Sequence, residues 1–175
     1  MNRIVVILIL GFNTLFSLDK CEIGYKVLYT IAQVERHPKR EVGYPYIISF
    51  NRTQDIAKLS DLVSEGQYEK LDNRSIDCKN QKNCVLIYSK ISQNQIPNVD
   101  LGAFQINPKY HQASPEDYFS LQKSIAIACG ILTEIKQKYG WSWESLAKYH
   151  SYEKKNNLKY QKHLKRYAGE YQGTR

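Results

Sequence analysis

The chain has 175 residues, with 25 lysines and arginines against 17 aspartates and glutamates, and its formal net charge is +8 at pH 7. This length is enough for one domain with a single sizeable core, and the lack of internal repeats and low-complexity linkers excludes a repeat array or several linked domains. A basic chain suits an anionic partner, either a nucleic acid or another acidic polymer.

The first 17 residues have the pattern of a secretory signal peptide. Arg3 supplies the positive charge, residues 4–12 form the apolar run, and Ser17 is a small residue suited to cleavage. The run is too short to cross a bilayer, although an uncleaved membrane anchor stays the alternative. We therefore expect an exported, periplasmic protein whose mature domain spans residues 18–175. Export also removes the opportunity to bind nucleic acid.

Helical periodicity dominates the mature chain. Apolar residues three and four positions apart predict a first helix over residues 22–35 and a second over residues 56–63, with Thr53 as N-cap of the second. Between them, residues 36–52 are expected to form a loop and a short extended stretch, which could pair as a small hairpin. A polar loop, a short helix and another loop are expected to follow, over residues 71–83, 85–91 and 93–99.

The clearest helix signal starts at Ser114. This residue is a suitable N-cap, and Pro115 fits the first turn because its missing N–H is not needed there. The apolar pattern continues to Gly140, a typical helix terminator. Two more helices are predicted over residues 142–149 and 158–168. The sequence thus predicts a mainly α domain, of the α+β type with at most a small β element.

Four cysteines follow the signal, and their even number in an exported protein favours two disulfides. Cys78 and Cys84 enclose a polar loop short enough for a local bridge, which leaves Cys21 to pair with Cys129. Three connectivities are compatible with the sequence alone. A zinc site is the alternative, but the spacing fits no standard zinc finger and no histidine lies near Cys78 or Cys84.

Glu35 stands at the end of the first predicted helix, after an apolar stripe that includes Val27 and Ile31, and the breaker His37-Pro38 follows it. A carboxyl group in this position lies half in the core and half in a cleft. Desolvation there raises the pKa of a glutamic acid and keeps it protonated near neutral pH, as a general acid requires. A helix-terminal surface glutamate is the alternative.

Three further motifs follow Glu35 in order: the octapeptide Asp100-Leu101-Gly102-Ala103-Phe104-Gln105-Ile106-Asn107, the tetrapeptide Ala147-Lys148-Tyr149-His150, and Tyr160. With Glu35 they resemble the lytic transglycosylase family (SLT domain, goose-lysozyme-like), and in particular the small specialised transglycosylases of secretion systems. The family has a Glu at a helix end, then Gly-Leu-Met-Gln-Ile, then Ala-x-Tyr-Asn, and a Tyr on the last helix. The resemblance covers about residues 23–167.

The resemblance implies a lysozyme-like single domain that needs neither a metal nor a cofactor. It also implies that Glu35 is the catalytic residue, first as the acid to the leaving oxygen and then as the base on the C6 hydroxyl of N-acetylmuramic acid. The N-acetyl group of the substrate acts as the nucleophile in this scheme, so the product is a 1,6-anhydromuramic acid end. The residues implied to bind substrate are Gly102, Phe104, Gln105, Tyr149, His150 and Tyr160.

The chain departs from the family pattern at several positions. Arg36 stands where the family has a Ser that orients the acid, and Ala103 and Phe104 stand where it often has Leu and Met. We expect Arg36 to affect catalytic efficiency more than the role of Glu35. His150 replaces an asparagine, and we interpret it as a variant of the site because a histidine is also a hydrogen-bond donor.

Glycosidic cleavage usually takes two carboxylates, so a second acid is needed unless the substrate assists. Asp100 is the one further acid within a motif, and its place just before the turn at Gly102 is better explained as the cap of a short helix. The sequence therefore favours the single-glutamate mechanism.

From these patterns we predict an exported, monomeric peptidoglycan lytic transglycosylase that cleaves the MurNAc-GlcNAc β-1,4 bond, with glycan strands and a secretion, pilus or flagellar assembly as partners. Residues 148–175 carry a local net charge of +6, which suits the carboxylates of peptidoglycan, although a solvated helix face has the same composition. One alternative is a muramidase that uses Asp100 or another acid to direct water. The other is a non-catalytic wall-binding assembly factor, with Arg36, Ala103 and His150 as marks of a decayed site.

Overall fold

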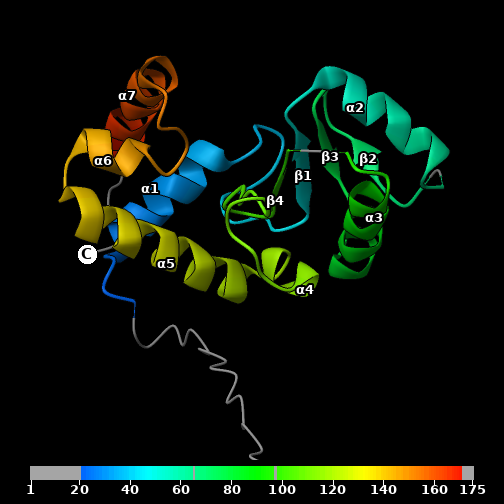
Figure 1. Cartoon of the computed structure of the whole chain (residues 1–175), viewed down its shortest axis with the longest axis horizontal. Helices are drawn as coiled ribbons and strands as arrows, with labels where there is room; N and C mark the ends of the chain where they lie inside the picture. The colour runs from blue at the N-terminus through cyan, green and yellow to red at the C-terminus, as the bar shows by residue number, and fades with distance from the viewer. Residues whose placement is uncertain (1–20, 65, 97, 171–175) are drawn as a thin grey trace, which may run out of the picture.

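The computed structural model describes residues 21–64, 66–96 and 98–170, so the predicted signal peptide at residues 1–17 lies outside the described residues. The described chain is mainly α-helical with one small antiparallel sheet, as predicted, and its elements form two groups side by side (Figure 1). The helical group consists of α1 (Tyr25–Glu35), α5 (Leu121–Tyr139), α6 (Trp143–Ala147) and α7 (Lys154–Glu170). The sheet group consists of β1 (Ile47–Phe50), α2 (Thr53–Ala57), the 3-10 turn η2 (Lys58–Asp61), β2 (Glu69–Lys70), β3 (Ser75–Asp77), α3 (Gln81–Gln93), β4 (Val99–Leu101) and α4 (Pro115–Tyr118).

Helix α1 positions Glu35 at its C-terminal end. The helix forms because apolar residues three and four positions apart, including Leu28 and Ile31, are buried against the core. It ends at Glu35 because Arg36 adopts an extended backbone (φ −61°, ψ 133°) and Pro38 cannot continue a helix. The helix packs against α7, which also packs against α6.

Helix α5 is the longest helix of the described chain, and it packs against α1 and α6. It has 19 residues and ends at Gly140, whose φ of +70° suits glycine. A disulfide joins Cys129 of this helix to Cys21, and a second joins Cys78 to Cys84. Both predicted pairings are therefore confirmed.

The single helix predicted from Ser114 to Gly140 is instead two helices, α4 and α5. The chain turns at Phe119, where both the Tyr118 and Phe119 rings are 1% exposed. The Tyr118 hydroxyl donates to the His111 carbonyl at 2.7 Å, which anchors this turn. Ser114 precedes Pro115 as expected, but its side chain makes no capping hydrogen bond.

The sheet has the strand order β2-β3-β1-β4, and each neighbouring pair is antiparallel. Strand β1 is central, with Ile48 opposite Ile76 of β3 and Leu101 of β4. The expectation of a small local hairpin within residues 36–52 was wrong, because β1 pairs with strands that lie far along the chain.

Strand β3 lies inside the segment 71–83, which was wrongly predicted to be only a loop. Its polar residues hid it from pattern analysis, yet they are buried and partnered. The Asp77 carboxylate accepts hydrogen bonds from Arg40 Nε at 2.7 Å and from the Tyr44 hydroxyl at 3.0 Å. The Ser75 hydroxyl lies 3.2 Å from that of Ser49 on β1. Polar cross-strand partners thus replace the apolar alternation that marks most strands.

Other helix boundaries differ from the prediction by a few residues. Thr53 is the first residue of α2 and not its cap, which is Arg52. Helix α3 begins at Gln81, earlier than predicted, because the Asn80 side chain accepts the Asn83 N–H at 2.9 Å and caps it. Ser142 caps α6 as predicted and forms a capping box with Ser145.

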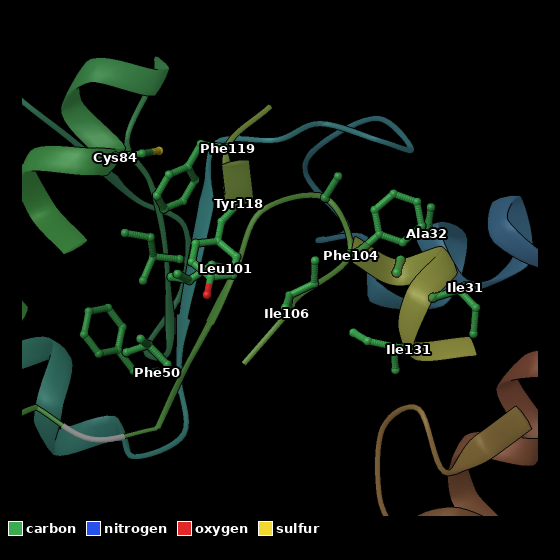
Figure 2. Packing of buried hydrophobic residues seen from close by; sticks show 14 of the residues in the cluster. Ile31, Ala32, Phe50, Cys84, Leu101, Phe104, Ile106, Tyr118, Phe119 and Ile131 are labelled. Carbon is green, nitrogen blue, oxygen red and sulfur yellow. The ribbon is translucent and has the colours of Figure 1, made fainter. Parts of the chain in front are cut away.

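One hydrophobic cluster extends through both groups. Figure 2 shows Phe104 and Ile106 between the sheet-group residues, such as Leu101, and the helical residues Ala32 and Ile131. The segment after β4 therefore joins the two groups through its side chains. None of the helices in the described part of the chain is long and apolar enough to cross a membrane.

Candidate active site

A cleft with a cavity of about 570 Å³ separates the two groups. Its sheet-side wall comes from strands β1, β3 and β4 and the loop before β3, and its helix-side wall comes from the end of α1, the middle of α5 and the loop between α6 and α7. The polar and ionisable residues that line the cleft include Glu35, Asn51, Arg74, Asp100, Gln105, Asn107, Tyr149 and His150. Three motifs far apart in the sequence therefore meet in one cavity.

Glu35 lies on the helix-side wall, with a side chain that is 11% exposed. Its Oε1 accepts a hydrogen bond of 2.6 Å from the Tyr160 hydroxyl. Burial raises the pKa of Glu35 to about 8, the Tyr160 hydrogen bond opposes this rise, and the nearby charge of Asp100 adds to it. The acid is therefore protonated near neutral pH, as the sequence predicted from its place at the helix end.

Tyr160 and His150 form the aromatic surroundings of this acid. Tyr160 is 4% exposed, and the His150 ring stacks on it with a centroid distance of 4.7 Å and an interplanar angle of 1°. His150 Nδ1 lies 3.8 Å from Glu35 Oε1, which is longer than a hydrogen bond. Desolvation lowers the pKa of His150 below its usual 6.5, so the imidazole is neutral at neutral pH, where the acid is protonated.

The octapeptide forms a tight turn after β4, in which Leu101 and Ile106 exchange two backbone hydrogen bonds of 3.0 and 2.9 Å. Gly102 has a φ of +73°, and a Cβ there would lie 2.0 Å from the Tyr118 carbonyl oxygen. Glycine is thus required for close approach of two backbone segments, whereas the sequence resemblance implied that Gly102 binds substrate. Gly102 and Phe104 are buried and do not line the cleft.

Gln105 and Tyr149 are held at the cleft by this turn. Gln105 Nε2 donates to the Gly102 carbonyl at 2.8 Å, and the Tyr149 hydroxyl donates to the Phe104 carbonyl at 2.9 Å. Of the residues predicted to bind substrate, Gln105, Tyr149 and His150 therefore line the cleft. Tyr160, Gly102 and Phe104 do not line the cleft. Each instead forms a hydrogen bond with a residue that does: Tyr160 donates to Glu35, and the Gly102 and Phe104 carbonyls accept from Gln105 and Tyr149.

Asp100 is not a helix cap, so this expectation was wrong. It lies in β4 and faces the cleft, where its carboxylate accepts hydrogen bonds from Asn107 Nδ2 at 2.9 Å and from Asn51 Nδ2 at 3.1 Å. Burial raises the pKa of Asp100, and the two amide hydrogen bonds oppose this rise. A second carboxyl group therefore lines the cleft, held by donors that favour its charged form.

Sequence analysis missed Asn51 and Arg74 among the cleft residues. Asn51 directly follows β1, and its role depends on β1 pairing with β4, which no local pattern indicates. Arg74 donates from Nε to the Phe50 carbonyl at 2.9 Å and lines the sheet-side wall. The departure at Arg36 is outside the cleft, where the side chain donates to the Arg40 carbonyl.

Within residues 21–64, 66–96 and 98–170, no group of His, Cys, Asp and Glu could hold a metal ion. The chain matches no protein-family model, and comparison with curated proteins and with solved structures gives no match. Function has to be inferred from the cleft itself.

Proposed function

We propose that this protein is a peptidoglycan lytic transglycosylase in which Glu35 acts as the single acid and base. The observation that carries the proposal is the nearly buried Glu35 carboxyl on the wall of a polar cleft, with a pKa of about 8 and a hydrogen bond from Tyr160. A carboxylic acid that stays protonated at neutral pH is what protonation of a glycosidic oxygen requires.

The reaction proceeds in two steps. Glu35 gives its proton to the glycosidic oxygen while the bond from that oxygen to C1 of N-acetylmuramic acid breaks, and the carbonyl oxygen of the N-acetyl group bonds to C1. The Glu35 carboxylate then takes the proton of the C6 hydroxyl, whose oxygen displaces the N-acetyl oxygen at C1. This closes the 1,6-anhydro ring and restores the protonated acid, so no water is consumed.

The neighbours of Glu35 have separate roles in this scheme. Tyr160 donates to Oε1 and leaves Oε2 to carry the proton toward the cleft. Gln105 uses an amide N–H on the Gly102 carbonyl, and in this scheme its side-chain oxygen accepts the N–H of an N-acetyl group. His150, which is half-exposed, presents a neutral ring beside the bond that breaks.

The proposed setting is the periplasm, after removal of a signal peptide. Two disulfides support an oxidising compartment, since such bonds persist after export and are rare in the cytosol. A small monomeric enzyme of this kind would open local gaps in the wall for a secretion, pilus or flagellar assembly. This last step rests on the sequence resemblance to specialised transglycosylases.

A muramidase is the second candidate, and the position of Asp100 favours it. A hydrolase needs a second carboxylate in the cleft to act as nucleophile or to activate water. Asp100 is a carboxyl group in the same cavity as Glu35, and two side-chain amides hold it there.

Mass spectrometry of fragments released from purified sacculi tests the proposal. A transglycosylase leaves anhydro ends that are about 18 Da lighter than hydrolysed ends, the mass of one water. Asp100→Asn separates the candidates, with Asp61→Asn, an exposed acid outside the cleft, as its control. Anhydro ends from wild type and from Asp100→Asn support the transglycosylase. Reducing ends that disappear in Asp100→Asn support the muramidase, and no release of either product rejects both.

A further inference from the structure

A second cavity of about 570 Å³ opens beside the cleft, and we refer to it as the side cavity. The two share part of their lining, including Ile131, Tyr149 and His150, so they lie next to each other. The lining of the side cavity follows α5 to its C-terminal end. That end of α5 lies near α6 and away from the sheet (Figure 1). A ligand in the cleft can therefore extend a branch into the side cavity.

Two tyrosines form the outer part of the side cavity. Tyr139 ends α5, Tyr152 lies in the loop before α7, and their ring centroids are 6.1 Å apart at an interplanar angle of 62°. Their side chains are 40% and 64% exposed. Exposed rings grouped at a cavity offer apolar surface together with hydroxyl groups, which suits a ligand of mixed polarity.

Two lysines are held at the same rings. Lys148 Nζ lies 4.8 Å from the Tyr139 centroid and 5.3 Å from the Tyr152 centroid, and Lys138 Nζ lies 5.4 Å from the Tyr139 centroid. Cation–π attraction therefore gathers two ammonium groups around one ring. Glu134 also lines the side cavity, but among the described residues neither lysine forms an ion pair with it or with any other acid.

Two like charges gathered at one ring repel each other, and a bound anion relieves this repulsion. We infer that the side cavity binds the carboxylate-bearing peptide branch of the glycan strand, with Lys138 and Lys148 as the groups that recognise it. This inference rests on the proposed function and specifies its substrate as strands that still carry peptides. The branch leaves the lactyl group of N-acetylmuramic acid, next to the bond that breaks, and the side cavity opens next to Glu35's neighbour His150.

Binding to an inactive protein tests the inference without a need for turnover. In a Glu35→Gln background, affinity is measured by calorimetry for two probes: a peptidoglycan tetrasaccharide with its peptides, and the same tetrasaccharide after enzymatic removal of the peptides. The test variant is Lys138→Gln/Lys148→Gln. The matched control is Lys136→Gln/Lys154→Gln, which removes the same charge from exposed lysines outside both cavities.

We expect the peptide-bearing probe to bind about tenfold more tightly than the bare probe at low salt, and the test variant to abolish this preference while the control keeps it. Equal affinity for the two probes, or an equal loss in the control, overturns the side cavity as a peptide site and leaves the proposed function standing. Failure of both probes to bind the Glu35→Gln protein rejects the proposed function as well.

Discussion

The helical group and the sheet group supply opposite walls of the cleft, and each places one carboxyl group there. Glu35 has a single hydroxyl donor, from Tyr160, in a setting of packed helices, whereas Asp100 has two amide donors from Asn51 and Asn107. Burial raises the pKa of both groups. The difference lies in the donors, because hydrogen bonds to a carboxylate stabilise its charged form.

The comparison shows how one chemical group acquires two behaviours in one cavity. The helical wall keeps Glu35 protonated to about pH 8, as the proposed role of proton donor requires. The sheet wall supports the charge of Asp100, which in turn raises the pKa of Glu35. Variants on the two walls should therefore change the pKa of Glu35 in opposite directions, and each of the following experiments tests a part of this contrast.

Glu35→Gln should have the largest effect, because it removes the group that we propose transfers the proton. Release of soluble fragments from sacculi should fall by about 100- to 10,000-fold. Glu41→Gln is the control, since Glu41 is exposed and outside the cleft, and it should keep wild-type activity. More than about a tenth of wild-type activity in Glu35→Gln would exclude Glu35 as the acid.

The same variant should be more stable than the wild type at neutral pH. The pKa of Glu35 is raised from its ordinary 4.5 to about 8 in the folded state, so its contribution to stability is complete below about pH 4.5 and is lost as the pH rises through about 8. Urea unfolding should show Glu35→Gln more stable by about 3 kcal/mol at pH 7, with no difference near pH 4. A constant difference at both pH values would contradict the buried-acid interpretation.

Gly102→Ala should be the most destabilising change at the junction of the two groups. The new Cβ would meet the Tyr118 carbonyl oxygen, and alanine is also strained at a φ of +73°. We expect the free energy of unfolding to fall by about 2–4 kcal/mol, measured by urea denaturation. Gly24→Ala is the control, because nothing lies within 4 Å of its Cβ position. Equal stability of the two variants would show that the turn relaxes.

Tyr160→Phe tests the helical wall with a smaller change. Loss of the hydroxyl removes the hydrogen bond that lowers the pKa of Glu35, so this pKa should rise above 8 and the alkaline limb of the pH–activity profile should move to higher pH. The rate should fall by about tenfold, since the acid is less well oriented. Tyr167→Phe, on the same helix but outside the cleft, should leave the profile in place. A shift to lower pH would reverse the assigned role of Tyr160.

Asp100→Asn tests the sheet wall and should have the smallest effect under the transglycosylase scheme. Removal of its charge lowers the pKa of Glu35, so the alkaline limb should move to lower pH, opposite to Tyr160→Phe. The free energy of unfolding should fall by about 1 kcal/mol, because the new amide presents N–H groups to Asn51 or Asn107. Both variants moving the limb in one direction would remove the contrast between the walls.

Much of the helical group could be predicted locally. The apolar spacing of α1 and the breaker after Glu35 placed this acid correctly at a helix end, and Gly140 marked the end of α5. The sheet group was harder to predict, because strand β3 is short and polar. The hydrogen bond that Asp77 of β3 accepts from Arg40 joins residues 37 positions apart. Asp100 was misread for the same reason, since it lies in a strand that pairs with β1, and one of its two donors, Asn51, comes from the residue after β1.

The sequence by itself indicated most of the helices, the candidate acid and the local Cys78–Cys84 loop, because periodicity, helix breakers and a short cysteine spacing act over a few residues. Only the tertiary structure decided the chemistry of the cleft. The hydrogen bond from Tyr160 to Glu35 spans 125 positions, and that from Asn51 to Asp100 spans 49. The protonation of a carboxyl group depends on burial and on hydrogen-bond donors from distant elements. The sequence therefore identified Glu35 as a candidate acid, but its raised pKa follows from the packing of α1 against α7.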